Sequence, residues 1–190
     1  LINEFNCHTK NVAEFNLPAG ENGEEVLTIE ALDGQLITNK IFSKAKIENG
    51  NLVSNIDTDT LKIVVVNSYF DAPVAVAFIK NFGLKKGAIA STVAHDSHNI
   101  IAVGVTDEEI CDAVNEIIIA RGGVSAILKE DGKDSKKLIP LPVAGLMSNE
   151  DGYAVAEAYT DIDQFVKSTL GSTLDAPFMT LSFMALLVIP

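Results

Sequence analysis

Near-continuous runs of apolar residues constrain this chain more than any other feature. They cover residues 61–66, 74–79, 88–94 and 100–105, and clusters of Gly, Asp or Asn separate them. Short apolar runs between such clusters are typical of strands whose two faces are both buried. The sequence therefore predicts that these strands form the core of a second unit, which begins after Thr60.

Two amphipathic helices are predicted after these strands. Thr106 and the acidic residues behind it form a capping box, so a helix is expected over residues 107–121, ended by a left-handed residue at Gly122-Gly123. A second helix is expected to begin at Ser148, to carry one apolar face and to end at Gly171. Strands followed by helices favour an α+β fold over a doubly wound sheet.

The hairpin predicted between these helices has a strand at residues 124–128, a solvated tip at 130–137 (EDGKDSKK) and a return strand at 138–141. Pro140 and Pro142 follow closely, and each removes a backbone N–H donor. The segment at residues 138–148 is therefore expected either at an edge of the sheet, the favoured reading, or in a loop that lines a site.

Residues 1–58 have a different texture, with short alternating runs and frequent turn signals. Strands are predicted at residues 26–31 and 35–38 around the Asp33-Gly34 turn, and a tight hairpin at residues 46–53. The predicted fold class is therefore α+β: a small β-rich, sandwich-like segment at residues 1–58, then a mostly antiparallel sheet domain with flanking amphipathic helices at residues 59–190.

Charge and composition exclude several classes of function. Lys and Arg total 14 against 26 Asp and Glu, a net charge of −12, so nucleic acid and anionic membrane surfaces are not expected partners.

The apolar run at residues 181–190 is too short to cross a bilayer, because it has about half of the ~20 residues that a membrane-spanning helix needs. The two cysteines, Cys7 and Cys111, are expected to be reduced thiols of a cytoplasmic protein. The first residue is Leu and the last lie in an apolar run, so we expect a fragment of a longer protein.

Polar chemistry is concentrated in one short loop between two apolar strands. The loop combines two imidazoles, a carboxylate, a hydroxyl and an amide, contributed by His95, Asp96, Ser97, His98 and Asn99. These groups can move protons and donate or accept hydrogen bonds. Asp and Asn also form ordinary turns, so a purely structural loop stays open as an alternative. A metal site within the loop is a third reading, but with three histidines in the chain its remaining ligands are not identified.

No catalytic residue and no metal ligand is assigned to this chain. Cys111 falls on the first predicted helix, among apolar positions, where a raised thiol pKa is expected, so it receives no nucleophilic role. The sequence also lacks a Walker loop, a G-x-S-x-G elbow and a G-x-G-x-x-G turn after a strand.

Residues 83–104 read GLKKGAIASTVAHDSHNIIAVG. Three further segments are residues 29–39 (IEALDGQLITN), 139–148 (IPLPVAGLMS) and 176–190 (APFMTLSFMALLVIP). The first segment closely and specifically resembles the C-terminal domain of the bacterial adenine deaminases of the amidohydrolase superfamily, and the other three also resemble that family, in the same order.

The resemblance implies a function and a missing partner. The family hydrolyses adenine to hypoxanthine and ammonia in an iron- or manganese-dependent (β/α)₈ barrel that would precede this region, residues 1–58 being the end of the barrel and the small β-rich segment. This chain lacks any H-x-H pair for such a site, so no cofactor is expected within it. The resemblance also implies a departure, because the family commonly has arginine where this chain has Ser68.

Two functional hypotheses follow. In the first, the 95–99 loop faces the barrel mouth and covers the purine base. Asp96 would accept a hydrogen bond from a ring N–H of the base or orient His98, with Ser97 and Asn99 in support. The isolated chain would be inactive. In the second, the chain is a non-catalytic binding or assembly module with oligomer contacts over residues 178–188. A homo-oligomer is expected in either case.

Overall fold

The computed structural model describes residues 2–130 and 132–186. Its strands are β1 (Glu25–Ala31), β2 (Thr38–Lys44), β3 (Lys46–Glu48), β4 (Asn51–Val53), β5 (Thr60–Val66), β6 (Ala75–Lys80), β7 (Ala88–Ser91), β8 (Ile100–Gly104), β9 (Gly123–Glu130) and β10 (Lys133–Pro140). Its helices are η1 (Val12–Phe15), α1 (Asp107–Ala120), α2 (Gly152–Ser168) and α3 (Pro177–Phe183). None of these helices is long and apolar enough to span a membrane.

The strands form an eight-stranded sheet in the order β10-β9-β7-β8-β5-β6-β1-β2 and a two-stranded sheet of β3 and β4. Among the described strands of the large sheet, neighbours are antiparallel except for β1 and β6, which are parallel. This arrangement confirms the α+β class with a mostly antiparallel sheet. β10 lies at one edge, as its prolines predicted.

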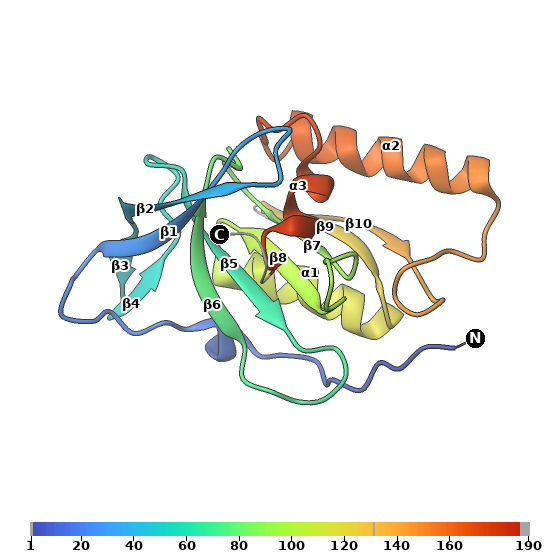
Figure 1. The fold of residues 1–190 in the computed structure, drawn as a ribbon, viewed down its shortest axis with the longest axis horizontal. Coiled ribbons are helices and arrows are strands. Elements are labelled where there is room, and N and C mark those ends of the chain that lie inside the picture. The colour runs from blue at the N-terminus through green and yellow to red at the C-terminus, as the bar shows by residue number, and fades with distance from the viewer. Residues whose placement is uncertain (1, 131, 187–190) are drawn as a thin grey trace.

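Both faces of the central strands are buried, because successive side chains point to opposite sides of a strand. On β5, Ile63 packs in a cluster with residues of α2 and α3, whereas Val64 packs in a cluster with residues of α1. Figure 1 shows α1 on the other side of the sheet from α2 and α3. The near-continuous apolar runs therefore reflect a sheet that lies between two layers.

Helix α1 begins where the capping box predicted. The Thr106 hydroxyl oxygen accepts a hydrogen bond from the backbone N of Glu109 at 3.2 Å. The same hydroxyl donates to a side-chain oxygen of Glu109 at 2.9 Å. The left-handed residue that ends the helix is Arg121, with a φ of 59°, one residue before the predicted Gly122-Gly123. Gly122 follows with a φ of 122°, and a Cβ there would also lie 2.5 Å from the Cα of Gly145.

The other helices differ from prediction at their starts. The N-cap of α2 is Asp151, whose carboxylate accepts hydrogen bonds from the next turn, so the predicted cap at Ser148 is wrong. The Ser148 hydroxyl oxygen accepts instead from the backbone N of Glu150 in a local turn. Helix α3 was not predicted, because seven residues hold too few turns to show helical periodicity.

Two hairpins also have different bounds from those predicted. The strand expected at residues 35–38 is instead β2 at Thr38–Lys44, and the connection from β1 takes up residues 32–37, where Leu36 and Ile37 are exposed. The tip predicted at residues 130–137 is much shorter, because β9 and β10 continue as charged, solvent-facing strands. Ion pairs such as Lys86 with Glu130 and Lys136 with Glu116 flank this extension.

The N-terminal segment packs on the α1 side of the sheet. Phe5 and Phe15 are buried in the same cluster as α1. Lys62 of β5 is fully buried, and its Nζ contacts the Asp107 carboxylate at 2.7 Å and donates to the backbone O of Phe15 at 3.0 Å. Since β1 pairs with β6, the large sheet includes strands from both sides of the predicted boundary at residues 58/59. That division stays a prediction.

Candidate functional site

The predicted loop connects β7 to β8, two central strands of the sheet. It is fixed to α3 because the backbone N of His95 donates to the backbone O of Ser182 at 2.8 Å. The loop then closes on itself, since the backbone N of His98 donates to the backbone O of Ala94 at 2.7 Å. His98 has a φ of 52°, in the left-handed region that few residues with side chains adopt.

A second set of contacts fixes the loop to the segment after β5. The backbone N of Ser68 donates to the side-chain oxygen of Asn99 at 3.2 Å, and the Ser68 hydroxyl donates to the backbone O of His98, also at 3.2 Å. The Tyr69 hydroxyl donates to the backbone O of Ser97 at 3.1 Å. Asn99 is therefore a structural member of the loop, and its amide oxygen is already engaged.

The histidines are partly buried. The imidazole of His95 stacks on the ring of Phe183, with 4.5 Å between ring centroids and 9° between planes. The His95 and His98 rings lie 6.3 Å apart. Their Nδ1 atoms are buried and have no hydrogen-bond partner within the described residues. Buried polar atoms are normally paired, so these nitrogens mark a place where the described residues leave a polar contact unmade.

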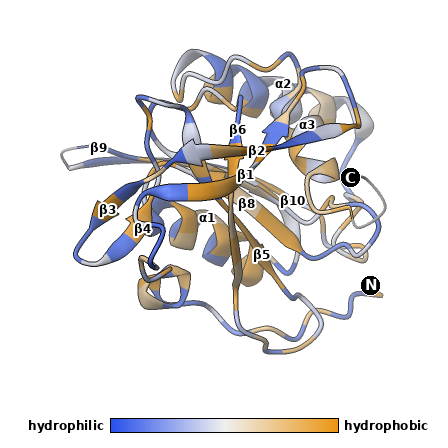
Figure 2. Ribbon diagram, turned by 60° about the vertical axis from the view of Figure 1, so that its left-hand side comes forward, coloured by the Kyte–Doolittle hydropathy of each residue, from blue (hydrophilic) through white to orange (hydrophobic). Residues whose placement is uncertain are grey.

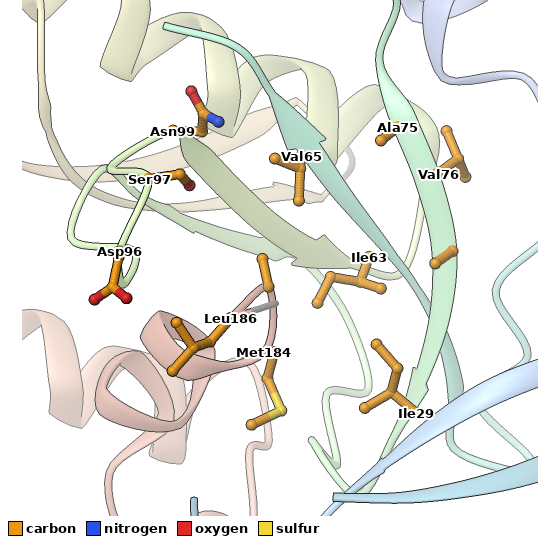
Figure 3. Close-up of a pocket in the computed structure, with 12 residues that line it drawn as sticks. Ile29, Ile63, Val65, Ala75, Val76, Asp96, Ser97, Asn99, Met184 and Leu186 are labelled. Atoms are coloured by element: carbon orange, nitrogen blue, oxygen red, sulfur yellow. The ribbon is translucent and has the colours of Figure 1, made fainter. Parts of the chain in front are cut away.

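Asp96 and Ser97 are the exposed members of the loop. Together with Asn99, they stand at the polar end of a pocket of about 670 Å³. The rest of the lining is apolar: Ile29, Ile63, Val65, Ala75, Val76, Ala77, Met184, Ala185 and Leu186. Figure 3 shows Asp96 pointing away from Asn99 and beside Leu186, with Ile63 and Val65 across the pocket. The structure thus brings three of the five predicted loop residues to the rim of an open pocket, and His95 and His98 are not part of its lining.

Sequence reasoning missed the residues that hold this loop and line the pocket. Ser68 and Tyr69 lie about thirty residues before the loop, and Ser182 lies well after it, so no local pattern connects them. Ser68 was noted only as a departure from the family's usual arginine, and that comparison stays a prediction. The signal for Ile63 and Val65 was present, but an apolar strand pattern does not show which residues line an open pocket.

The described residues do not suit the iron or manganese that the resemblance implies. No group of three or more His, Cys, Asp and Glu side chains comes together in the described part of the chain. His95, Asp96 and His98 lie in one loop but do not form such a group, and the His95 ring is stacked on Phe183. No ligand set within this region can therefore be named, and no chemical step is drawn through a metal here.

The other chemical groups considered from the sequence are structural. Burial raises the pKa of the Cys111 thiol to about 11, as its predicted helical position indicated. The segment predicted to supply oligomer contacts is largely internal, because Phe178, Leu181 and Met184 are buried in the core. The end of that segment, residues 187–188, lies outside the described residues.

Comparison with known proteins gives a consistent result. Residues 35–190 match the family model described as the adenine deaminase C-terminal domain. An adenine deaminase from Methanosarcina barkeri is 50% identical over 194 residues, a match that covers 99% of this chain and 34% of the relative. One from Sulfurovum sp. is 50% identical over 188 residues, covering 99% and 33%. One from Salinibacter ruber is 44% identical over 191 residues, covering 100% and 34%.

The chain thus spans about a third of the length of these curated relatives. The family match extends across β2 to α3 and includes the 95–99 loop with the residues that hold it. On this evidence, the chain belongs to the adenine deaminase C-terminal domain family.

Proposed function

We propose that this chain is the C-terminal part of an adenine deaminase, and that its 95–99 loop covers an active site formed mainly by a preceding portion. The reaction would be hydrolysis of adenine to hypoxanthine and ammonia. The proposal is supported by the relatives' printed names and by their length, about three times that of this chain. Any iron or manganese would be held by the preceding portion.

One observation carries the role of the loop. Its backbone is fixed by contacts from Ser182, Ser68 and Tyr69, yet the Asp96 carboxylate and the Ser97 hydroxyl remain exposed at the rim of a pocket. A turn needed only to connect two strands does not require polar side chains held outward by a rigid frame. Such a frame suits a group that must meet a substrate in one geometry.

The chemistry of the exposed groups fits a purine base. An ionised carboxylate accepts hydrogen bonds only, so Asp96 can accept from a ring N–H or from the exocyclic amine of adenine. A loop closed over the base would also exclude bulk water from the reacting carbon, leaving the attacking water as the only one admitted. In this role Asp96 binds and orients the base, and Ser68 acts as a positioning residue through the loop backbone.

The test is kinetic and uses the full-length protein. For Asp96→Ala we expect kcat/KM for adenine to fall at least about tenfold, equivalent to about 1.4 kcal/mol of transition-state stabilisation. Glu157→Ala is a matched control, because Glu157 is an exposed carboxylate on α2, distant from the loop in sequence. The control should keep its kcat/KM. A loss below about threefold in Asp96→Ala, about 0.65 kcal/mol, would leave the loop as a structural turn.

A further inference from the structure

One part of a sheet face carries apolar side chains that the described residues cover only partly. On the face that α2 and α3 share, α2 packs on β9 and β10 and α3 packs on β7 and β8. Beyond them on that face, Leu61, Ile63 and Ile79 are buried, but other apolar side chains of β5, β6, β1 and β2 are exposed or half-buried. We call this surface the open face and define it by Leu27, Ile29, Phe42, Val65, Ala75 and Ala77.

Strand register places these six side chains on one side. Leu27 is opposite Phe42 in the antiparallel pair of β1 and β2. Ala75 is opposite Val65 in the pair of β6 and β5. Residues two apart on a strand share a face, which adds Ile29 to Leu27 and Ala77 to Ala75. Figure 2 shows the hydrophobic character of β5 in the centre of the sheet.

The exposure of this surface is not matched on the other side of the same strands. Leu27 is 51% exposed and Phe42 is 66% exposed. By contrast Val26, Val64 and Phe78, which point the opposite way, are buried by the N-terminal segment and its neighbours. A contiguous apolar surface of this kind on a folded domain marks a place where another protein surface packs.

We infer that the open face is where the preceding portion of the full-length protein packs. The relatives are about three times as long as this chain, so about two thirds of the polypeptide remains to be placed. The open face is continuous with the pocket, whose polar end carries Asp96 and Ser97. A domain seated on the open face would meet the exposed side of the 95–99 loop. The inference rests on the proposed function only for the existence of that preceding portion.

Thiol labelling tests this directly. In full-length protein, Ala77→Cys and Leu27→Cys should react with a maleimide at least 100-fold more slowly than Ala158→Cys. Ala158 is a matched control, because it is an exposed alanine on α2, away from the open face. Each rate is normalised to that of the same variant unfolded in urea, and the native Cys7 and Cys111 are both buried.

The outcomes are distinct. Slow labelling at both open-face positions that stays slow when the protein is diluted far enough for any oligomer to dissociate, as light scattering checks, supports the inference. Labelling as fast as at Ala158→Cys overturns it. Slow labelling that becomes fast on dilution, with a matching fall in mass by light scattering, shows that a second copy covers the face, and also overturns it. The readout needs no turnover, so a covered face in a protein without adenine deaminase activity would refute the proposed function alone.

Discussion

Burial alters the chemistry of Cys111 more than any neighbouring group does. Its Sγ donates to the backbone O of Lys10 at 3.3 Å, and the Asn115 amide donates to the same sulfur at 3.4 Å. Burial is the largest cause that raises the thiol pKa from 9.0 to about 11, and the Asp112 carboxylate adds to it. A thiol with this pKa stays protonated, and therefore unreactive, throughout the neutral range.

We predict that the alkylation rate of Cys111 in the native protein rises with pH toward a midpoint near 11 rather than 9. A Cys7→Ala background leaves Cys111 as the only thiol. The measurement is the rate of iodoacetamide modification from pH 7 to 10, followed by mass spectrometry, with urea-unfolded protein as the reference. A native rate at pH 8 equal to the unfolded rate would contradict the burial argument.

At the scale of elements, α1 depends on its first turn. The Thr106 hydroxyl donates a hydrogen bond to one oxygen of the Glu109 carboxylate. The other Glu109 oxygen accepts a hydrogen bond from the backbone N of Lys129 in β9 at 3.1 Å. The cap therefore joins the helix to the sheet. Ile110 and Ile117, both fully buried, then contribute about 1.5–3 kcal/mol each when packed on the strands.

We predict that Thr106→Ala lowers the free energy of unfolding by about 1 kcal/mol or somewhat more. The hydroxyl acceptor for the Glu109 N–H would be lost, and the buried Glu109 side chain would lose one of its donors. Urea unfolding followed by circular dichroism measures the change. Thr106→Ser keeps the hydroxyl and should recover most of the loss; equal stability of the two variants would show that the cap does not matter.

At the scale of the whole molecule, residues on both sides of the predicted 58/59 boundary share one core. β1 extends the sheet from β6, and the buried Lys62 ammonium depends on the backbone O of Phe15 as well as on Asp107. An unpaired charge in a protein interior is strongly unfavourable. Removal of the N-terminal segment would also expose the apolar side chains that lie beneath it.

We predict that residues 59–190 alone do not form a stable domain. The expected result is poor amide dispersion in a ¹H–¹⁵N spectrum and rapid cleavage by trypsin, whereas residues 1–190 give a dispersed spectrum and a resistant core. A well-dispersed spectrum from residues 59–190 would show that they fold independently and that the division at residue 58 describes two domains.

The sequence by itself determined the elements whose signal is local. The apolar runs at β5 to β8, the start of α1 at Thr106 and the edge position indicated by the prolines at the end of β10 each depend on residues close in the chain, and the structure confirms them. The loop at residues 95–99 was found in the same way, because its polar residues interrupt two buried strands. Their positions follow from periodicity and capping, which need no knowledge of distant residues.

Only the tertiary structure decided which of these loop residues have exposed side chains and which have side chains engaged in contacts within the chain. The contacts of Ser68, Tyr69 and Ser182 with the loop join segments that are far apart in the chain. They show that the Asn99 side chain is engaged within the chain, whereas the Asp96 side chain is exposed. The same holds for the open face, because the apolar sequence pattern of a strand is the same whether or not a helix covers that strand. Coverage depends on where other elements pack, and that is fixed by the three-dimensional arrangement of the whole chain.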